Sequence, residues 1–255
     1  MPLWQSRQLR KRWRYVGVFD SELMICAARV QVGIFNQSFW AAWDREGKQH
    51  FGHTSMRPGG REVTMTGPRV EIASKQLQAG LELGEVAPIE TICPSGGSWG
   101  WTRKRAGMAA SGSVEAAGQR WDLNGFGVDD ESAGYHRRHT DWHWSAGIGR
   151  TVEGAAVAWN LVEGINDPVR DSERAIWVDG EPSEPEPVAF RGLDAIEFED
   201  GSQLRFAKES ERTRSDNMLL IRSSYRLHFG SFSGSLGGLE LAEGLGVMEE
   251  HHAVW

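Results

Sequence analysis

The sequence predicts an all-β protein built from antiparallel sheets. Three observations lead to this fold class. Apolar and polar residues alternate over much of the chain, Gly and Asp-Gly turns separate the alternating segments, and no segment carries the caps and the i, i+3, i+4 apolar stripe of a helix. Two halves of similar length and character indicate either two packed β-barrels or one long barrel-like sandwich.

Short segments of the first half predict consecutive strands over residues 14–20, 23–34, 38–44, 61–67, 69–74 and 77–84. Residues 45–49 are expected to form a hairpin turn that Asp44 stabilises, with Gly47 free to adopt a positive φ. The Ala-, Gly- and Ser-rich part of 97–125 fits either a loosely packed strand or a short helix.

The second half continues the pattern, with strands expected over residues 141–149, 154–164, 174–180, 187–192, 195–201, 202–208, 217–236 and 244–255. The proline-rich segment 181–187 cannot join a central strand. Gly and Asp concentrate in residues 123–134, so we place the join between the halves there. The expected domains are residues 1–125 and 126–255.

Charge and hydropathy narrow the possible partners. The chain has 255 residues and a formal net charge of -7, with acidic and basic residues interspersed, which argues against nucleic acid as its main partner. No apolar run reaches the roughly 18 residues of a membrane span, and no apolar segment follows the N-terminal basic residues as in a secretory signal. Cys26 and Cys93 are expected to be free thiols, so we expect a soluble, cytoplasmic protein.

Tryptophan is unusually frequent, with 12 Trp against 3 Tyr. An indole N–H needs a hydrogen-bond partner when it is buried, so this number indicates either a broad aromatic core or a cavity lined with indoles. Trp40 and Trp43 fall on opposite faces if their strand is regular.

The segment RHTDWHWSA, residues 138–146, carries the first candidate site. On a strand, Arg138, Thr140, Trp142 and Trp144 share one face. This face combines apolar area with a guanidinium and a hydroxyl group, which is typical of the wall of a ligand cavity.

The other face of that segment allows a metal interpretation. His139, Asp141 and His143 alternate there and could be ligands of one zinc or iron ion. A solvated polar face gives the same pattern, and the closed ligand set of a structural site is missing. We therefore expect no metal site, while the choice between solvent and a metal stays open for these three side chains.

Two further segments contribute candidate residues. Asn160 is either a structural amide or a group that orients a ligand. Glu249, His251 and Trp255 alternate onto one face near the C-terminus, where the glutamate and the histidine could form a proton-transfer pair or a buried structural pair. No nucleophile elbow, phosphate-binding loop, zinc-protease motif or dinucleotide fingerprint occurs, and we expect no cofactor.

Six segments together resemble the bacterial family known as domain of unknown function 2804: RWRYVGVFDSELMICAARVQVG, GYHRRHTDWHWSAGIG, AVAWNLVEGIND, AIWVDG, FGSFSG and GVMEEHHAVW. The resemblance runs from about Arg12 to Trp255. Its most specific motifs are Arg-x-Thr-x-Trp-x-Trp from Arg138, Asn-Leu-x-x-Gly from Asn160 and Glu-x-His-x-Ala-x-Trp from Glu249. These positions lie on the expected cavity wall, which weighs further against a metal.

That family is similar in turn to the lipocalin-like group containing hydroxyneurosporene synthase, a carotenoid hydratase, and tocopherol cyclase. The resemblance implies two tandem antiparallel lipocalin-like β-barrels packed together, with a cavity for greasy ligands. It implies fold more firmly than function, and no catalytic residue is carried over from those enzymes.

Three functions remain open at this point. The first is binding of an apolar, isoprenoid- or lipid-like molecule in a Trp-lined cavity by Arg138, Thr140, Trp142, Trp144, Asn160 and Trp255. Arg138 would bind an anionic or carbonyl group, or pair with Glu249. The second is a cofactor-independent hydratase, cyclase or isomerase in which Glu249 or His251 donates a proton. The third is a structural or partner-binding β-sandwich. The sequence does not indicate an oligomeric state.

Overall fold

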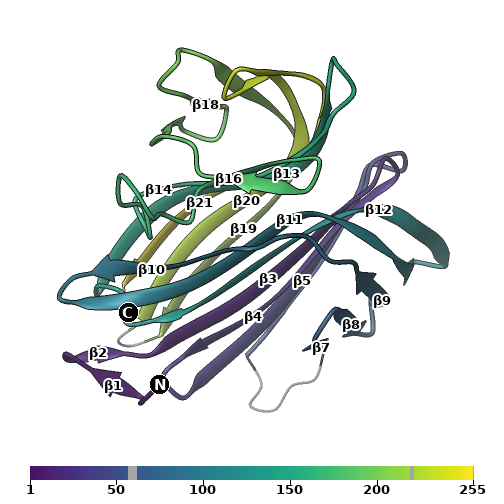
Figure 1. The fold of residues 1–255 in the computed structure, drawn as a ribbon. Helices are drawn as coiled ribbons and strands as arrows, with labels where there is room; N and C mark the ends of the chain where they lie inside the picture. The colour runs from purple at the N-terminus through teal and green to yellow at the C-terminus, as the bar shows by residue number, and fades with distance from the viewer. Residues whose placement is uncertain (57–61, 219–220, 255) are drawn as a thin grey trace.

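The protein consists of strands and connecting segments throughout residues 1–56, 62–218 and 221–254, which the computed structural model describes (Figure 1). No helix occurs in these ranges, so the all-β prediction is confirmed. The first half contains β1 (Trp4–Gln5), β2 (Gln8–Leu9), β3 (Lys11–Phe19), β4 (Leu23–Val32), β5 (Phe35–Asp44), β6 (Gln49–Ser55), β7 (Val63–Thr66), β8 (Arg69–Ala73), β9 (Leu77–Leu83), β10 (Ile89–Ser95), β11 (Ser98–Ala116) and β12 (Gln119–Gly134). The second half contains β13 (His139–Thr151), β14 (Ala156–Glu163), β15 (Ala175–Val178), β16 (Glu181–Ser183), β17 (Ala189–Arg191), β18 (Ala195–Glu197), β19 (Gln203–Met218), β20 (Ile221–Leu236) and β21 (Leu239–Val254).

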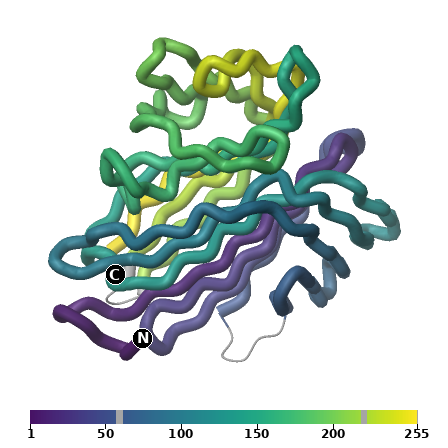
Figure 2. Tube along the Cα trace, in the orientation of Figure 1, coloured from purple at the N-terminus to yellow at the C-terminus, as the bar shows by residue number. Residues whose placement is uncertain are grey.

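Two antiparallel sheets account for all strands except the β1–β2 hairpin. The first sheet has the order β6-β5-β4-β3-β12-β11-β9-β8-β7, with β10 paired to β11, and the second has the order β16-β15-β14-β13-β21-β20-β19-β18-β17. The first sheet curls far enough for β7 to lie against β4 and β5. Figure 2 shows the two curled sheets packed one against the other, which is the two-barrel, lipocalin-like arrangement expected from the sequence.

The chain passes from the first sheet to the second between Gly134 and His139. Strand β12 runs without interruption through the expected domain boundary at residues 125 and 126, so the division into domains 1–125 and 126–255 stays a prediction. The proline-rich segment contributes only β16, a three-residue strand at the edge of its sheet, as expected for a segment that lacks backbone donors.

Alternation along the strands produces three apolar cores. On β3, Val16 and Val18 point into a core inside the first barrel, whereas Tyr15 and Phe19 point into a core between the barrels. A third core fills the second barrel. Each barrel is therefore apolar inside and also carries an apolar patch on the outer surface that faces its neighbour.

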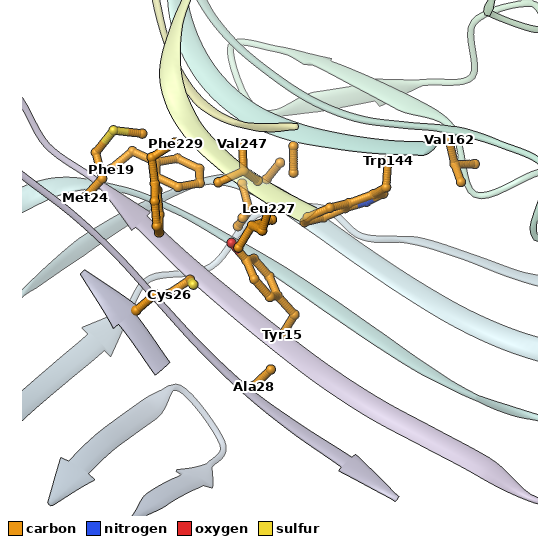
Figure 3. Close-up of a cluster of buried hydrophobic side chains, with 14 of the residues drawn as sticks. Tyr15, Phe19, Met24, Cys26, Ala28, Trp144, Val162, Leu227, Phe229 and Val247 are labelled. Carbon is orange, nitrogen blue, oxygen red and sulfur yellow. The ribbon is translucent and has the colours of Figure 1, made fainter. Parts of the chain in front are cut away.

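Trp40 and Trp43 divide between the cores in the same way, because Trp40 lies in the first barrel and Trp43 lies between the barrels. The predicted opposite faces are thus confirmed. Figure 3 shows the core between the barrels, where Tyr15 from the first barrel lies across from Trp144 of the second.

The Ala-, Gly- and Ser-rich run belongs to β11 and is not a helix. The register of β11 against β12 shifts at Gly107, which has a φ of 83°. An extra residue in one strand forms a β-bulge, and glycine tolerates the positive φ that this one requires.

The hairpin turn after β5 forms as expected, with one difference. The Oδ1 atom of Asp44 accepts a hydrogen bond from the backbone N–H of Gly47 at 3.0 Å, so the stabilising role of Asp44 is confirmed. The positive φ belongs to Lys48, at 54°, and the prediction for Gly47 is wrong. The carboxylate anchors the backbone at Gly47, which leaves the next residue to reverse the chain.

Cys26 and Cys93 are free, as expected, and both are buried. Within the described ranges we find no helix with the length and apolar character required to cross a bilayer.

Candidate functional site

A small cavity lies between the two barrels, at the end where β3 begins and β21 ends. Its volume is about 100 Å³. The first barrel contributes Trp13, Tyr15, Ala28, Val30, Phe39 and Asp130 to the wall, and the second barrel side contributes Trp142, Trp144, Val162, Ile165, Glu173, Tyr225, Glu249 and His251. We call this space the interbarrel cavity. Figure 3 shows part of it, with Tyr15 and Ala28 on one side and Trp144 and Val162 on the other.

Two of the larger hollows in the described chain differ from it in chemistry. One of about 260 Å³ lies at the other end of the interface between the barrels, and its wall is rich in Gly and Ala. The other, of about 940 Å³, is lined mainly by polar side chains of the first barrel. The interbarrel cavity combines an aromatic wall with residues that the sequence singled out.

Strand register explains how those residues meet. Strands β13 and β21 are antiparallel neighbours in which Trp142 lies directly opposite His251, and Trp144 lies opposite Glu249. Side chains of directly opposed residues project from the same face of a sheet. The two indoles and the two ionisable groups therefore form one four-residue patch, although about 100 residues separate them in sequence.

Glu249 and His251 are joined to their neighbours by short contacts. The Oε1 atom of Glu249 accepts a hydrogen bond from the indole N–H of Trp142 at 3.1 Å and lies 3.4 Å from Nδ1 of His251. Nε2 of His251 lies 2.8 Å from the hydroxyl of Ser223. The imidazole also packs on the Trp142 ring at 4.0 Å between centroids and on Tyr225 at 5.4 Å. These contacts fix both ionisable groups at the cavity wall.

Asn160 acts on the cavity through Trp144. Its Oδ1 atom accepts a hydrogen bond from the Trp144 indole at 2.8 Å, and its side-chain NH₂ group donates to the backbone oxygen of Glu173 at 2.9 Å. Asn160 does not itself form part of the wall. These contacts agree with the interpretation of Asn160 as a structural amide. Asn160 orients the indole of Trp144, which lines the cavity and packs edge-on against Tyr15.

A buried charged cluster, which the sequence did not reveal, forms the inner end of the cavity. Nζ of Lys104 forms ion pairs with Asp130 and, at 3.2 Å, with Oε2 of Glu173. Lys104 is only 1% exposed. Burial raises the pKa of Asp130 to about 6, with Lys104 acting in the opposite direction and Glu173 adding to the rise. Asp130 thus has the character of a weak acid that can exchange a proton near neutral pH.

Contacts of the two carboxylates tie this cluster to the cavity wall. The indole of Trp13 donates a hydrogen bond to Oδ1 of Asp130 at 3.3 Å, and Nδ2 of Asn166 donates one to Glu173 at 2.8 Å. Behind Trp13 lies His136, buried at a ring-centroid distance of 5.0 Å. Burial lowers the pKa of His136 to about 4, so its imidazole is neutral at physiological pH.

Four of the expected site residues lie away from the cavity or outside the described chain. Arg138 is exposed in a bend just before β13, and no contact joins it to Glu249 in the described ranges. Arg138 is not among the lining residues of the interbarrel cavity, because it precedes the first residue of β13, His139. Thr140 is buried on β13 but does not line the cavity, Asn160 stands behind Trp144, and Trp255 lies outside the described residues.

The face proposed for a metal is occupied by pairwise contacts. Oδ1 of Asp141 lies 2.8 Å from Nδ1 of His252, and Nε2 of His143 lies 3.6 Å from Oε1 of Glu250. His139 is exposed at the start of β13. In the part of the chain that the structure describes, no three His, Cys, Asp or Glu residues are grouped as a metal site.

Comparison with protein families gives one match. The model of the family described as a domain of unknown function (DUF2804) matches residues 57–255, which is most of the chain. No curated protein matches the sequence.

Solved structures share the fold at low sequence identity. A candidate AttH protein from Nitrosomonas europaea superposes with a TM-score of 0.59 at 11% identity, over 94% of this chain and 92% of that one. Kievitone hydratase from Nectria haematococca gives 0.56 at 8% identity, with 96% and 88% coverage. A third structure, CghA, gives 0.54 at 10% identity, with 96% and 87% coverage. Identities this low establish a common fold and do not transfer a function.

Proposed function

This chain belongs to the family described as a domain of unknown function (DUF2804), and we propose that it binds an apolar small molecule in the interbarrel cavity. The expected ligand is isoprenoid- or lipid-like. It would place one end between the barrels and extend the rest toward the surface past Trp13, Trp142 and Val30, which are only partly buried.

The observation that carries the proposal is the composition of the cavity wall. Six of its fourteen residues are Trp, Tyr or Phe, and its polar groups are few and converge from both barrels. Pockets for small molecules combine apolar and aromatic walls with a small number of placed polar groups. The cavity is smaller than the roughly 300–1,000 Å³ of pockets that enclose whole drug-sized ligands. Its volume is nearer that of an apolar cavity of about 150 Å³ that binds benzene, so it suits one end of a ligand.

A fluorescence titration tests the proposal. Ligand entering the cavity changes the environment of Trp142 and Trp144, so isoprenoid alcohols and fatty acids of increasing length should change the emission saturably. The substitution Trp142→Ala should weaken binding by roughly tenfold or more, since removing a stacked aromatic side chain costs on the order of 1–3 kcal/mol. Trp101→Ala is the matched control, because Trp101 is also half-buried but lies on β11 outside the wall.

Native mass spectrometry of the freshly purified protein, followed by organic extraction, identifies any ligand that remains bound. A protein that carries no extracted ligand and shows no saturable change with any apolar probe would contradict the binding function. That result would favour the remaining alternative, a structural or partner-binding β-sandwich whose tryptophans fill the space between the barrels.

A second candidate function is acid catalysis on the bound molecule without a cofactor. Kievitone hydratase, by its name a hydratase, shares the fold, and hydration of an alkene needs a proton donor in a dry pocket. Glu249 and His251 are the donors proposed from the sequence. Asp130 is a further candidate, since burial raises its pKa to about 6. The donor would protonate one alkene carbon, water would add to the resulting cation, and the carboxylate would take the excess proton from that water.

Product analysis separates catalysis from binding. A catalyst should convert an extracted or titrated isoprenoid to a product that contains one added water, or to a cyclised or isomerised product of equal mass. If Asp130 is the donor, Asp130→Asn should abolish turnover while ligand binding persists. If Glu249 is the donor, Glu249→Gln should do so instead. Binding without any conversion would exclude the catalytic function for that ligand class.

We also propose a reducing, cytoplasmic location. Its support is the pair of free, buried thiols at Cys26 and Cys93, which fits a compartment where cysteines remain reduced.

A further inference from the structure

The ionisable groups in the wall of the interbarrel cavity are mostly acidic. The wall contains the carboxylates of Asp130, Glu173 and Glu249, together with the imidazole of His251. No Lys or Arg is among the fourteen lining residues. Aromatic ring faces are also electronegative, and six aromatic residues complete the same wall.

Cations behind the wall do not fully balance these carboxylates. Lys104 pairs with both Asp130 and Glu173. Arg212 lies over the rings of Phe39 and Tyr225, at 4.5 and 4.9 Å from their centroids, and is not part of the wall.

Glu249 is the carboxylate that forms no ion pair with a fixed cation, although Arg212 acts on it through space. Its contacts are the Trp142 indole N–H and His251, and no Lys or Arg in the described ranges forms an ion pair with it. The three carboxylates of the wall are therefore accompanied by two fixed cations, Lys104 and Arg212. A buried carboxylate is favourable only when it is paired or well hydrogen-bonded, so this wall has room for one more positive charge.

An unused polar group gives an independent indication that a ligand completes the site. Tyr225 lines the cavity and is only 5% exposed, yet its hydroxyl has no hydrogen-bond partner within the described chain. Buried hydroxyl groups in folded proteins nearly always have a partner. A polar ligand group beside the Glu249–His251 pair would supply it, because His251 packs 5.4 Å from the Tyr225 ring.

From this we infer that the ligand of the interbarrel cavity carries a single positive charge, as an amine or quaternary ammonium group, held by Glu249 and the surrounding aromatic rings. The inference rests on the proposed binding function and adds the charge of the ligand to it. The small volume of the cavity fits a compact cationic head, with the apolar part of the ligand extending toward Trp13 and Val30. Aromatic walls combined with a carboxylate are a recurrent way of recognising such cations.

Three compounds of nearly equal shape test the charge directly: choline, its neutral carbon analogue 3,3-dimethylbutan-1-ol, and the anionic 3,3-dimethylbutanoate. Each is titrated into the full-length protein, and binding is followed by calorimetry and tryptophan fluorescence. Choline should bind at least tenfold more tightly than the neutral alcohol, which corresponds to about 1.4 kcal/mol. The anion should bind more weakly than either. Equal or tighter binding of the alcohol or of the anion would overturn the inference.

A pair of neighbouring substitutions locates the effect. Glu249→Gln should reduce the preference for choline over the alcohol to less than threefold. Glu250→Gln is the matched control, since Glu250 lies next in the strand, does not line the cavity and pairs with Arg226. An unchanged preference in Glu249→Gln would also overturn the inference.

The outcomes distinguish this inference from the function on which it rests. If neither choline nor the alcohol binds while longer isoprenoid or fatty ligands still give saturable titrations, the charged-ligand inference fails and apolar binding stands. If no compound of either series binds, both fail.

Discussion

Removing the buried cation at the inner end of the cavity should strongly destabilise the protein. Lys104→Met replaces the ammonium group with an apolar group of similar length and leaves Asp130 and Glu173 facing each other without a counter-charge. The side chains of these three residues are 1%, 11% and 3% exposed, so solvent cannot compensate for the loss. Breaking a buried ion pair on one side costs about 3–5 kcal/mol.

Proton linkage gives a magnitude consistent with that range. A carboxyl group with an ordinary pKa of 3.8 that must be protonated in the folded state costs up to about 4 kcal/mol at pH 7, since each pKa unit corresponds to about 1.4 kcal/mol. Asp130 already bears part of this cost, because burial raises its pKa to about 6. Loss of Lys104 removes the positive charge that opposes this rise, so the pKa of Asp130 increases further.

Urea unfolding at pH 7 and at pH 5 measures the effect. We expect Lys104→Met to lose about 3–5 kcal/mol at pH 7, or roughly 10 °C in Tm for a chain of this size. The loss should shrink at pH 5. An acid whose folded-state pKa is raised binds more protons in the folded state than in the unfolded state, so the penalty grows as pH rises.

Two controls make the result specific. Lys208→Met removes an exposed lysine whose partner Glu211 is also about half exposed, and should cost less than about 1 kcal/mol. The triple substitution Lys104→Met, Asp130→Asn, Glu173→Gln neutralises the cluster and should recover most of the lost stability. A loss in Lys104→Met no larger than in the control, or one that is equal at pH 5 and pH 7, would refute the buried-charge reasoning.

Three further results are expected. His136, whose pKa burial lowers from 6.5 to about 4, is neutral when folded and charged when unfolded between these values; its stabilising contribution is therefore present above pH 6.5 and lost as pH falls toward 4. His136→Gln should remove about 3 kcal/mol of this pH dependence in urea unfolding, and parallel pH profiles would contradict it. Gly246→Ala should destabilise the protein by about 2 kcal/mol or more, because a Cβ there would lie 2.3 Å from a backbone oxygen of β13, whereas Gly80→Ala has no atom within 4 Å and should be nearly neutral in thermal unfolding. Burial raises the pKa of Cys26 to about 11 and that of Cys93 to about 12, so a thiol-specific reagent should label neither in the native protein and both after unfolding; rapid native labelling would show that one thiol is accessible.

The strands could be predicted from the sequence because burial in a β-protein leaves a period of two. This signal fails where both faces of a strand are polar. Residues 209–216 carry no apolar alternation, yet they continue β19, since their backbone pairs with β20 regardless of side-chain type. It also fails at turns, where Asp44 and not glycine flexibility decides which residue takes the positive φ.

From the sequence, the candidate site could be predicted only to the extent that alternation shows which residues of one strand share a face. Alternation placed Trp142 and Trp144 on one face of their strand, and Glu249 and His251 on one face of theirs. That these two pairs lie directly opposite each other depends on the register between β13 and β21. Arg138 precedes the first residue of β13, so the alternation of that strand does not extend to it.

The charged cluster was out of reach for a related reason. Lys104 and Asp130 are opposed across β11 and β12, and Glu173 arrives from the segment between β14 and β15 in the other half of the chain. Neighbouring charges in the sequence do not show which of them face inward. Asp129, the residue before Asp130, points to the opposite face and pairs with Arg14 and Arg105.

The sequence does indicate where the barrels meet, in strands whose residues do not alternate between apolar and polar. Leu23–Ala28 and Phe39–Trp43 are unbroken apolar runs, and the structure buries every residue in both. A strand of a single solvated barrel buries one face only, whereas an unbroken run indicates burial on both faces. These runs lie on the neighbouring strands β4 and β5, and β4 in turn pairs with β3. Their outward side chains Ala28 and Phe39 form part of the cavity wall with Tyr15. Doubly buried strands therefore mark the surface where the barrels meet, and a cavity at that surface can draw ionisable groups from both halves of the chain.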